Sequence, residues 1–209
     1  MGDRIFLRGT SRERFRLMLQ LAEIFYSIQG EGTHTGKPAV FVRLAGCNLA
    51  CAFCDTDYSL KFVASVAQVV DRVRALGGEC PMVVITGGEP LAQRETLALI
   101  EALRQAGKRV HIESNGTVET ELPGDVWLTV SPKERLVARM AQRANEAKLI
   151  VDGRVPREFL SAFDGSTTAM FLQPEGNKPR NIELALEAAK AEPQRFRLSL
   201  QTHKFIGVR

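Results

Sequence analysis

The chain has 209 residues, with 28 Lys plus Arg against 24 Asp plus Glu, a formal net charge of +4. At 44% hydrophobic and 25% charged residues it has the composition of a globular domain, large enough to bury about 70% of its unfolded surface without disulfides or metal. The sequence contains no apolar run of membrane-spanning length, no signal-peptide core near its start and no block of like charges, so we expect a cytoplasmic protein without a membrane or nucleic-acid partner.

β-rich runs alternate with amphipathic helical patterns along the whole chain. Several of these runs are almost continuously apolar, which is typical of strands covered on both faces. The predicted strands are residues 23–28, 40–44, 82–86, 109–113, 126–130, 147–151, 170–173 and 196–201.

Three stretches between the strands show helical spacing together with capping signals. The first opens on Ser65, with Gln68 three positions later, which is the spacing of a capping box. The second ends just before Gly107, a favourable residue after a helix, and Asn181 stands where an N-cap precedes the third. The predicted helices are residues 65–76, 93–105 and 182–190.

Alternating β and α units predict an α/β fold with mostly parallel strands and right-handed crossovers. A complete eight-fold barrel needs about 250 residues, so this length favours a shortened, partial (β/α)6-type barrel. A doubly wound nucleotide-binding sheet is the competing architecture, but no G-x-G-x-x-G or Walker sequence follows an early strand. We expect one catalytic domain over residues 21–209 and an N-terminal extension over residues 1–20.

Three of the four cysteines, Cys47, Cys51 and Cys54, follow the second predicted strand in a C-x₃-C-x₂-C pattern. In a reducing compartment such a group of thiols indicates metal binding or catalysis rather than disulfides. Three thiolates can bind three irons of a cubane cluster and leave the fourth iron open, whereas a structural zinc site requires four protein ligands. His34 and Cys80 lie far from this pattern in sequence, so an iron–sulfur cluster is favoured over zinc. Cys80 itself is expected to be an ordinary buried thiol.

The cysteine pattern, combined with Gly87-Gly88-Glu89-Pro90 after the third predicted strand, resembles the radical S-adenosylmethionine (SAM) superfamily. In that superfamily the GGEP segment ends a strand and its backbone binds the amino group of SAM. Glycines let backbone approach a ligand closely, and βα enzymes place their sites at strand C-termini. From about residue 21 onward the chain is similar to the 7-carboxy-7-deazaguanine synthase family, in segments 25–32 (FYSIQGEG), 36–38, 41–44, 54–56, 113–117 (ESNGT), 130–133, 173–174 and 201–204.

This resemblance implies a defined reaction and defined cofactors, namely a [4Fe–4S] cluster, SAM and Mg²⁺. The family converts 6-carboxy-5,6,7,8-tetrahydropterin to 7-carboxy-7-deazaguanine with loss of ammonia, in the biosynthesis of queuosine and related 7-deazapurines. A 5′-deoxyadenosyl radical removes hydrogen from C6 of the substrate, the ring contracts, and SAM is regenerated. The resemblance further implies a homodimer and an electron donor of the flavodoxin or ferredoxin type.

The family's functional positions carry over to this chain residue by residue. Arg43 is expected to form a bidentate pair with the substrate carboxylate, and alternation in the strand turns it inward, where a charge needs a partner. The pterin edge is rich in hydrogen-bond donors, so Gln29 or Glu31 is expected to bind it as an acceptor. His203 is expected at the end of the last strand. No protein residue is assigned as catalytic, since the cofactor carries the radical chemistry. The implied substrate-binding residues are Ile28, Gln29, Gly30, Arg43, Thr86, His203 and Arg209.

Cofactor positions cluster around the cysteine pattern and at later strand ends. Thr56 matches a Mg²⁺ ligand, a role in which a hydroxyl combined with substrate oxygens and water suits a hard cation. The cluster ligands are Cys47, Cys51 and Cys54, and the SAM-binding positions are Phe53, Cys54, Asp55, Gly88, Ser131, Pro132, Lys133, Gln173, Pro174, Glu175 and Gly176.

Two other functions remain compatible with the sequence alone. A radical SAM activase, which installs a glycyl radical in a partner protein, shares the cysteine spacing and would need a protein-docking groove. A nucleic-acid-binding module with a structural metal is suggested only by the sequence pI near 9.0, and predicts zinc and a clustered basic face.

Overall fold

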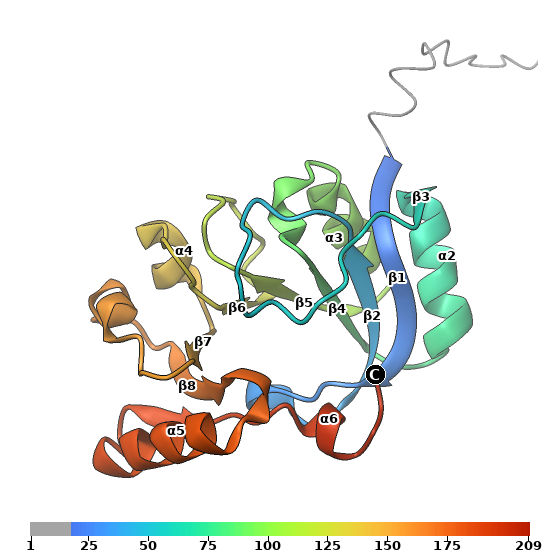
Figure 1. The fold of residues 1–209 in the computed structure, drawn as a ribbon. Helices are drawn as coiled ribbons and strands as arrows, with labels where there is room; N and C mark the ends of the chain where they lie inside the picture. Colours follow the sequence, from blue (N-terminus) through green and yellow to red (C-terminus); the bar gives the residue numbers. More distant parts are fainter. Residues whose placement is uncertain (1–17) are drawn as a thin grey trace, which may run out of the picture.

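The computed structural model describes residues 18–209, which form one curved sheet with helices along its outer side (Figure 1). Most of the predicted N-terminal extension lies outside the described residues, while residues 18–20 open the first strand. The strands are β1 (Met18–Ile28), β2 (Pro38–Leu44), β3 (Phe62–Ser65), β4 (Met82–Gly87), β5 (Arg109–Ser114), β6 (Trp127–Val130), β7 (Glu146–Val151), β8 (Ala169–Pro174) and β9 (Phe196–Leu198).

The sheet is open and has the strand order β3-β1-β2-β4-β5-β6-β7-β8-β9. From β2 through β4 to β9 every neighbouring pair is parallel, whereas β1 runs antiparallel to both β2 and β3. The parallel strands therefore end along one edge of the sheet. The predicted α/β architecture, a partial barrel of mostly parallel strands, is confirmed.

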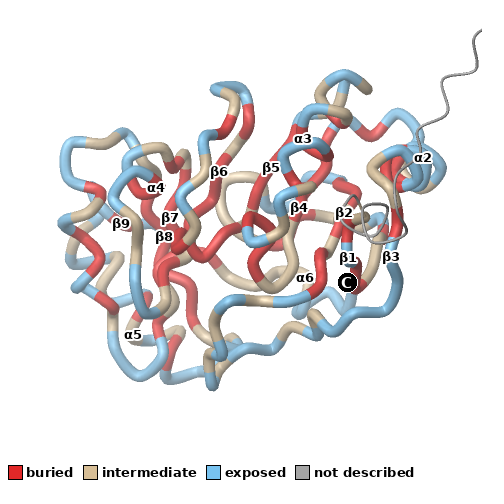
Figure 2. Tube along the Cα trace, turned by 90° about the horizontal axis from the view of Figure 1, so that it is seen from above, coloured by how far each residue is buried: buried red, intermediate tan, exposed pale blue. Residues whose placement is uncertain are grey.

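Helices pack against the convex face of this sheet. Contacts join α2 to β1, α3 to β5, α4 to β6 and α5 to β8, so this face carries the main apolar core. Seen from above, the buried residues follow the central strands and the exposed ones follow the surrounding loops and helix backs (Figure 2). The helices are α2 (Val66–Gly77), α3 (Thr96–Gln105), α4 (Ala138–Arg143), α5 (Pro179–Ala191) and α6 (Thr202–Phe205), with 3₁₀ turns η1 (Gly32–His34), η2 (Pro90–Ala92), η3 (Arg157–Phe163) and η4 (Glu175–Asn177).

Strand alternation separates an apolar outer face from a partly polar inner face. In β7, Ala147 and Leu149 belong to the helix-covered core, while Lys148 between them lines a cavity on the concave side. The same two-residue period divides Val42 from Arg43 in β2. Runs that look largely apolar in sequence thus still carry one or two inward-facing polar residues.

Several predicted boundaries differ from the structure, since β1 begins at Met18 and α3 at Thr96, and two further differences concern residues given a role from sequence. Helix α5 begins at Pro179, because proline is well suited to the first turn, and Asn181 is not its N-cap. The Asn181 side chain is instead buried, where it accepts from the Gly153 amide at 2.9 Å and donates to the Glu175 carbonyl at 3.3 Å.

The last strand is also shorter than predicted and ends at Leu198. His203 lies in helix α6 rather than at a strand end, since the Thr202 amide bonds to the Gly30 carbonyl at 2.9 Å and draws the chain away from the sheet. The edge strand β3 and the short α4 have no counterpart among the predicted elements. Within the described part of the chain, no helix has the length and apolar content that crossing a bilayer requires.

Helix α2 carries the capping box expected at Ser65 and Gln68. The Gln68 amide donates to the Ser65 hydroxyl oxygen at 3.3 Å, and the Ser65 amide donates to the Gln68 side chain at 2.9 Å. We expect Ser65→Ala to lower the free energy of unfolding by about 1 kcal/mol, because it leaves a helical N–H without its partner. Urea denaturation measures this, with Ser65→Asp as the control that keeps an acceptor. Equal stability of Ser65→Ala and wild type would contradict the assignment.

Candidate active site

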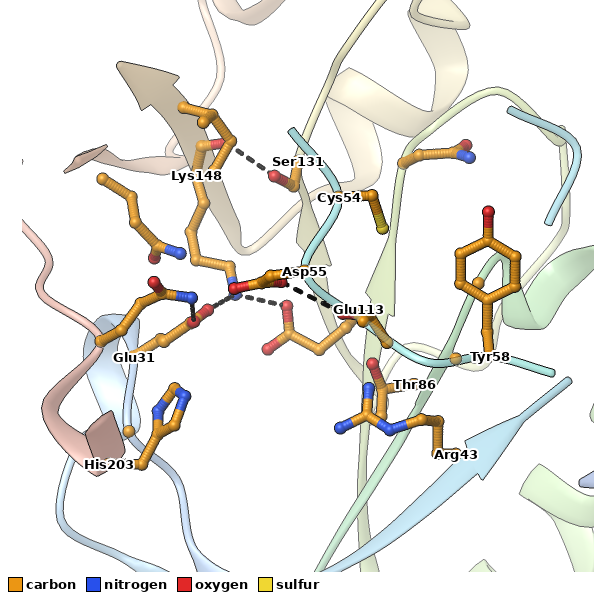
Figure 3. A pocket seen from close by; sticks show the side chains of 18 of the residues that line it. Glu31, Arg43, Cys54, Asp55, Tyr58, Thr86, Glu113, Ser131, Lys148 and His203 are labelled. Carbon is orange, nitrogen blue, oxygen red and sulfur yellow. Dashed lines mark hydrogen bonds and ion pairs between the residues drawn. The ribbon is translucent and has the colours of Figure 1, made fainter. Parts of the chain in front are cut away.

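A cavity of about 490 Å³ opens at the C-terminal edge of the parallel strands, a volume within the usual range for small-ligand sites (Figure 3). The residues that line it come from β1, β2, β4, β5, β7 and β8, together with the cysteine loop, the residues just after β6 and the segment around α6. Of the site residues expected from sequence, Pro132 is buried and does not line the cavity. Those that do are Ile28, Gln29, Gly30, Arg43, Cys47, Cys51, Phe53, Cys54, Asp55, Thr56, Thr86, Gly88, Ser131, Lys133, Gln173, Pro174, Glu175, Gly176, His203 and Arg209.

The three clustered cysteines lie on one loop between β2 and β3 and carry free thiols. Cys47 and Cys51 are half-buried and Cys54 is exposed. The Leu49 amide donates to the Cys47 sulfur at 3.4 Å, and the Cys54 amide bonds to the Cys51 carbonyl at 3.1 Å. Across residues 18–209 no three His, Cys, Asp or Glu side chains gather around a single ion position. A cubane cluster does not need such a gathering, because each cysteine binds a different iron.

The end of β4 packs directly beneath this loop. A Cβ placed on Gly88 would lie 2.1 Å from the Gly46 carbonyl oxygen and 2.6 Å from Cys47 Cβ, so only glycine permits this approach. The Glu89 amide then bonds to the same Gly46 carbonyl at 3.0 Å. The glycine segment and the cysteine loop thus form one surface, with the half-buried backbone of Gly87 and Gly88 lining the cavity beside the thiols. This donor set fits an iron–sulfur cluster with an amino-acid ligand next to it.

Glu89 supports that surface from below rather than facing the cavity. Its buried carboxylate accepts from the amides of Leu91 at 3.0 Å and Asn115 at 2.7 Å, and from the Ser114 hydroxyl at 3.0 Å. Burial raises its pKa despite these donors. The carboxylate therefore ties the end of β4 to the end of β5.

Inward-facing side chains at the strand ends form the cavity floor. Arg43 on β2 lies directly opposite Thr86 on β4, and Glu113, Lys148 and Gln173 continue the row on β5, β7 and β8. All of them face inward because side chains alternate with period two, and all except Lys148, which lies in the middle of β7, stand near the C-terminal end of their strand. The floor therefore carries charged and amide groups that are far apart in sequence.

The centre of the floor is a buried lysine between two carboxylates. Lys148 Nζ lies 2.5 Å from Glu31 Oε2 and 2.7 Å from Glu113 Oε2 (Figure 3). The Gln201 amide donates to the second oxygen of Glu31 at 3.1 Å, and the Gln29 amide donates to Glu113 at 3.3 Å. One ammonium group thus holds two carboxylates side by side.

The two carboxylates differ in acidity although they share Lys148. Burial alone raises the pKa of Glu31, but the Lys148 charge and the hydrogen bonds from Lys148 and Gln201 outweigh it and hold this pKa at about 2. Burial also dominates at Glu113, where the nearby charges of Glu31 and Glu146 add to it and the pKa rises to about 7 against the opposing effect of Lys148. Glu31 is therefore ionised at neutral pH, while Glu113 exchanges a proton there.

The chain after β9 closes one side of the cavity. A Cβ on Gly30 would lie 2.1 Å from His203 Nδ1, so the imidazole packs directly on the backbone of the β1–β2 connection. Lys204 forms an ion pair with Asp55, which joins α6 to the cysteine loop. His203 and Asp55 therefore sit in one wall although 148 positions separate them in sequence.

Two expectations about single residues are confirmed. Arg43 faces the cavity as the strand alternation predicts; its Nε donates to Glu23 Oε1 at 2.8 Å, and its pairing with the substrate carboxylate stays a prediction. Cys80 is buried and its thiol donates to the Pro38 carbonyl at 3.3 Å, away from the cavity.

Several cavity residues were not assigned from sequence. Lys148 and Glu113 stand in alternating strands, and a charge at an inward position of an otherwise apolar strand is the signal that could have identified them. Glu23, Gln201 and Lys204 carried no comparable signal, because their partners lie in distant segments.

Comparisons with known proteins agree with this geometry. The family model described as the Radical SAM superfamily matches residues 41–141. A 7-carboxy-7-deazaguanine synthase from Bacteroides thetaiotaomicron is 40% identical over 197 residues, covering 92% of this chain and 100% of the relative. One from Bordetella pertussis is 41% identical over 213 residues, covering 89% and 97%.

Solved structures show the same relationship at the level of the fold. The crystal structure of QueE from Escherichia coli superimposes with a TM-score of 0.77 at 30% identity, covering 93% of this chain and 100% of that one. The SAM-bound structure of SuiB from Streptococcus suis gives a TM-score of 0.56 at 11% identity, covering 74% and 48%. The second likeness is one of fold alone.

Proposed function

This chain belongs to the 7-carboxy-7-deazaguanine synthases, radical SAM enzymes of 7-deazapurine biosynthesis, and on that premise we propose that its cavity binds 6-carboxy-5,6,7,8-tetrahydropterin as substrate. The observation that carries the proposal is the meeting of three elements in one cavity. These are a three-cysteine loop, a glycine-lined strand end beneath it, and a floor with carboxylates at its centre and an arginine at its side. The reaction is ring contraction to 7-carboxy-7-deazaguanine with loss of ammonia.

Cys47, Cys51 and Cys54 would hold a [4Fe–4S] cluster, leaving one iron for SAM. The proposed SAM-binding segments are Phe53–Asp55, the backbone at Gly88, Ser131 to Lys133 and Gln173 to Gly176. Pro132 does not line the cavity and belongs to this set only as the residue between Ser131 and Lys133. When bound, the cluster and SAM supply reductive radical chemistry that takes a hydrogen atom from the substrate. Thr56, which lines the same cavity, is the proposed protein ligand of Mg²⁺, with substrate and water oxygens completing the shell.

The cavity floor would bind the pterin by accepting hydrogen bonds from its N–H groups. The amino-pyrimidinone edge of a pterin presents N–H donors, and the ionised Glu31 and the Gln29 amide oxygen are acceptors on that side of the cavity. Glu113 adds a carboxyl group that accepts or donates according to its proton. Lys148 fixes both carboxylates before the substrate arrives, so little reorganisation is needed on binding.

The opposite end of the pterin carries the substrate carboxylate, which Arg43 is placed to bind. Its planar guanidinium suits a bidentate pair, and Thr86 lies directly beside it on β4. Ile28, Gly30 and His203 complete the wall that positions the ring, with Arg209 at the outer rim. The substrate is thus oriented by an anion-binding group at one end and by carboxylates at the other.

The remaining parts of the proposal concern partners and compartment. We propose an electron donor of the flavodoxin or ferredoxin type, a homodimer, and a cytoplasmic location, where the four free thiols stay reduced. The family membership sets aside both the glycyl-radical activase and the nucleic-acid module considered from sequence.

Anaerobic reconstitution with iron and sulfide, followed by dithionite, SAM and carboxytetrahydropterin, tests the substrate assignment. We expect the deazaguanine chromophore to appear only when all components are present. Formation of 5′-deoxyadenosine without that chromophore would show a radical SAM enzyme acting on another substrate.

A further inference from the structure

A second guanidinium lies beside Arg43 on the cavity wall formed by β1 and β2. Glu23 and Arg43 are directly opposite each other in the antiparallel pair, and Glu23 Oε1 lies 2.8 Å from Arg43 Nε. The other carboxylate oxygen, Oε2, lies 3.3 Å from Arg209 Nη1. One carboxylate therefore bridges two arginines that are 166 positions apart in sequence.

An aromatic ring beneath them orients both guanidinium groups. The carbon centres of Arg43 and Arg209 lie 5.9 Å and 5.7 Å from the centre of the Phe25 ring, within reach of a cation–π interaction. Phe25 is itself fixed by stacking on Phe41, with ring centres 5.0 Å apart and planes 7° from parallel. The Ser27 hydroxyl donates to the Arg209 carbonyl at 2.5 Å, which anchors the backbone of this arginine to β1.

The charges of this group do not cancel. Two guanidiniums share the one carboxylate of Glu23, so these three side chains together carry one excess positive charge where they line the cavity. Only Nε of Arg43 donates to Glu23, and within residues 18–209 its two Nη groups have no hydrogen-bond partner. A carboxylate from a ligand would supply the acceptors that these Nη groups lack.

We propose that the Arg209 side chain is a second carboxylate-binding group of this enzyme and that Glu23 is the positioning residue that sets it beside Arg43. This inference rests on the proposed pterin substrate and deepens it. The resemblance marks residue 209 only as a position whose backbone or terminal carboxylate faces substrate, whereas the structure places its guanidinium at the subsite. The Arg209 side chain is 73% exposed, so its pair with Glu23 is weak enough to rearrange toward a bound anion.

The test compares two probes that differ only in the carboxylate, 6-carboxypterin and unsubstituted pterin. Anaerobic calorimetry on the reconstituted enzyme with SAM gives both dissociation constants. We expect Arg209→Gln to weaken binding of 6-carboxypterin by about tenfold, the scale of one charged hydrogen bond, and to leave pterin unchanged. Arg197→Gln is the matched control, because Arg197 is also exposed and stacked on a phenylalanine but lies outside the cavity.

A double-mutant cycle tests the role of Glu23. If Glu23 positions Arg209, the loss caused by Arg209→Gln should be smaller in a Glu23→Gln background than in wild type. Additive losses would overturn the positioning role, and equal weakening of both probes by Arg209→Gln would show that residue 209 merely covers the cavity. Failure of wild type to bind either probe would overturn the proposed substrate. If Arg209→Gln kept the wild-type ratio of the dissociation constants for pterin and 6-carboxypterin, only this inference would be overturned.

Discussion

Replacing Cys51 by Ala is expected to abolish turnover, a loss of at least about 10³-fold, since the chemistry belongs to the cofactor. Two thiolates cannot hold three irons of the cluster, so the reconstituted variant should also lose its brown absorbance and most of its bound iron. Cys51 is half-buried on a loop outside the apolar core, so the fold should persist. Iron content, visible absorbance and product formation, measured on the same preparation, check this result.

Cys80→Ala is the matched control for this experiment. The Cys80 thiol is buried beneath β2 and bonds to backbone carbonyls away from the cavity. Its removal should leave iron content and activity near the wild-type level. Iron and activity retained in Cys51→Ala, or lost equally in both variants, would refute the three-cysteine assignment.

Replacing Lys148 by Met should have the largest effect on stability. Removal of the ammonium leaves two carboxylates buried without their cation, which costs about 3–5 kcal/mol when one partner of a buried pair is lost. Substrate affinity should fall as well, because Glu31 and Glu113 lose the group that holds them side by side. Chemical denaturation at about pH 8 measures the first effect, and the KM for substrate measures the second.

The pH dependence separates this electrostatic effect from simple loss of packing. In wild type, Glu31 has a pKa of about 2 against an ordinary value of 4.5, so its contribution to stability is present above pH 4.5 and is lost as the pH falls toward 2. Without Lys148, burial raises the pKa of both carboxyls above the unfolded value. The folded variant then binds more protons than its unfolded chain. The difference in free energy of unfolding between wild type and Lys148→Met should therefore shrink as the pH falls from about 8 to about 5.

Lys148→Arg is the companion variant, since it keeps the charge and changes only the shape. It should be closer to wild type in stability than Lys148→Met at the higher pH. If the loss of stability in Lys148→Met did not change with pH, it would come from the packing of the lysine side chain and not from its charge.

Helix caps and strand positions could be predicted from sequence, because the interactions that set them involve residues close together along the chain. The Ser65 and Gln68 capping box involves neighbours on one turn, and the strands follow from a two-residue apolar period. Asn181 shows where this reasoning fails, since a favourable N-cap residue is used inside a helix to bond two other segments. His203 fails similarly, because a contact with Gly30 ends the sheet earlier than the apolar pattern does.

The sequence by itself determined the cysteine loop, the glycine segment after β4 and the alternation of strands and helices, because each depends on residue type and short spacing. Only the tertiary structure decided that Glu31, Glu113 and Lys148 form one charge network, and that Glu23 bridges Arg43 to Arg209. These groups meet because parallel strands end along one edge and the last segment returns to the first strand. The acidity of a carboxyl depends on burial and on such distant charges, so no reading of neighbouring residues could assign it.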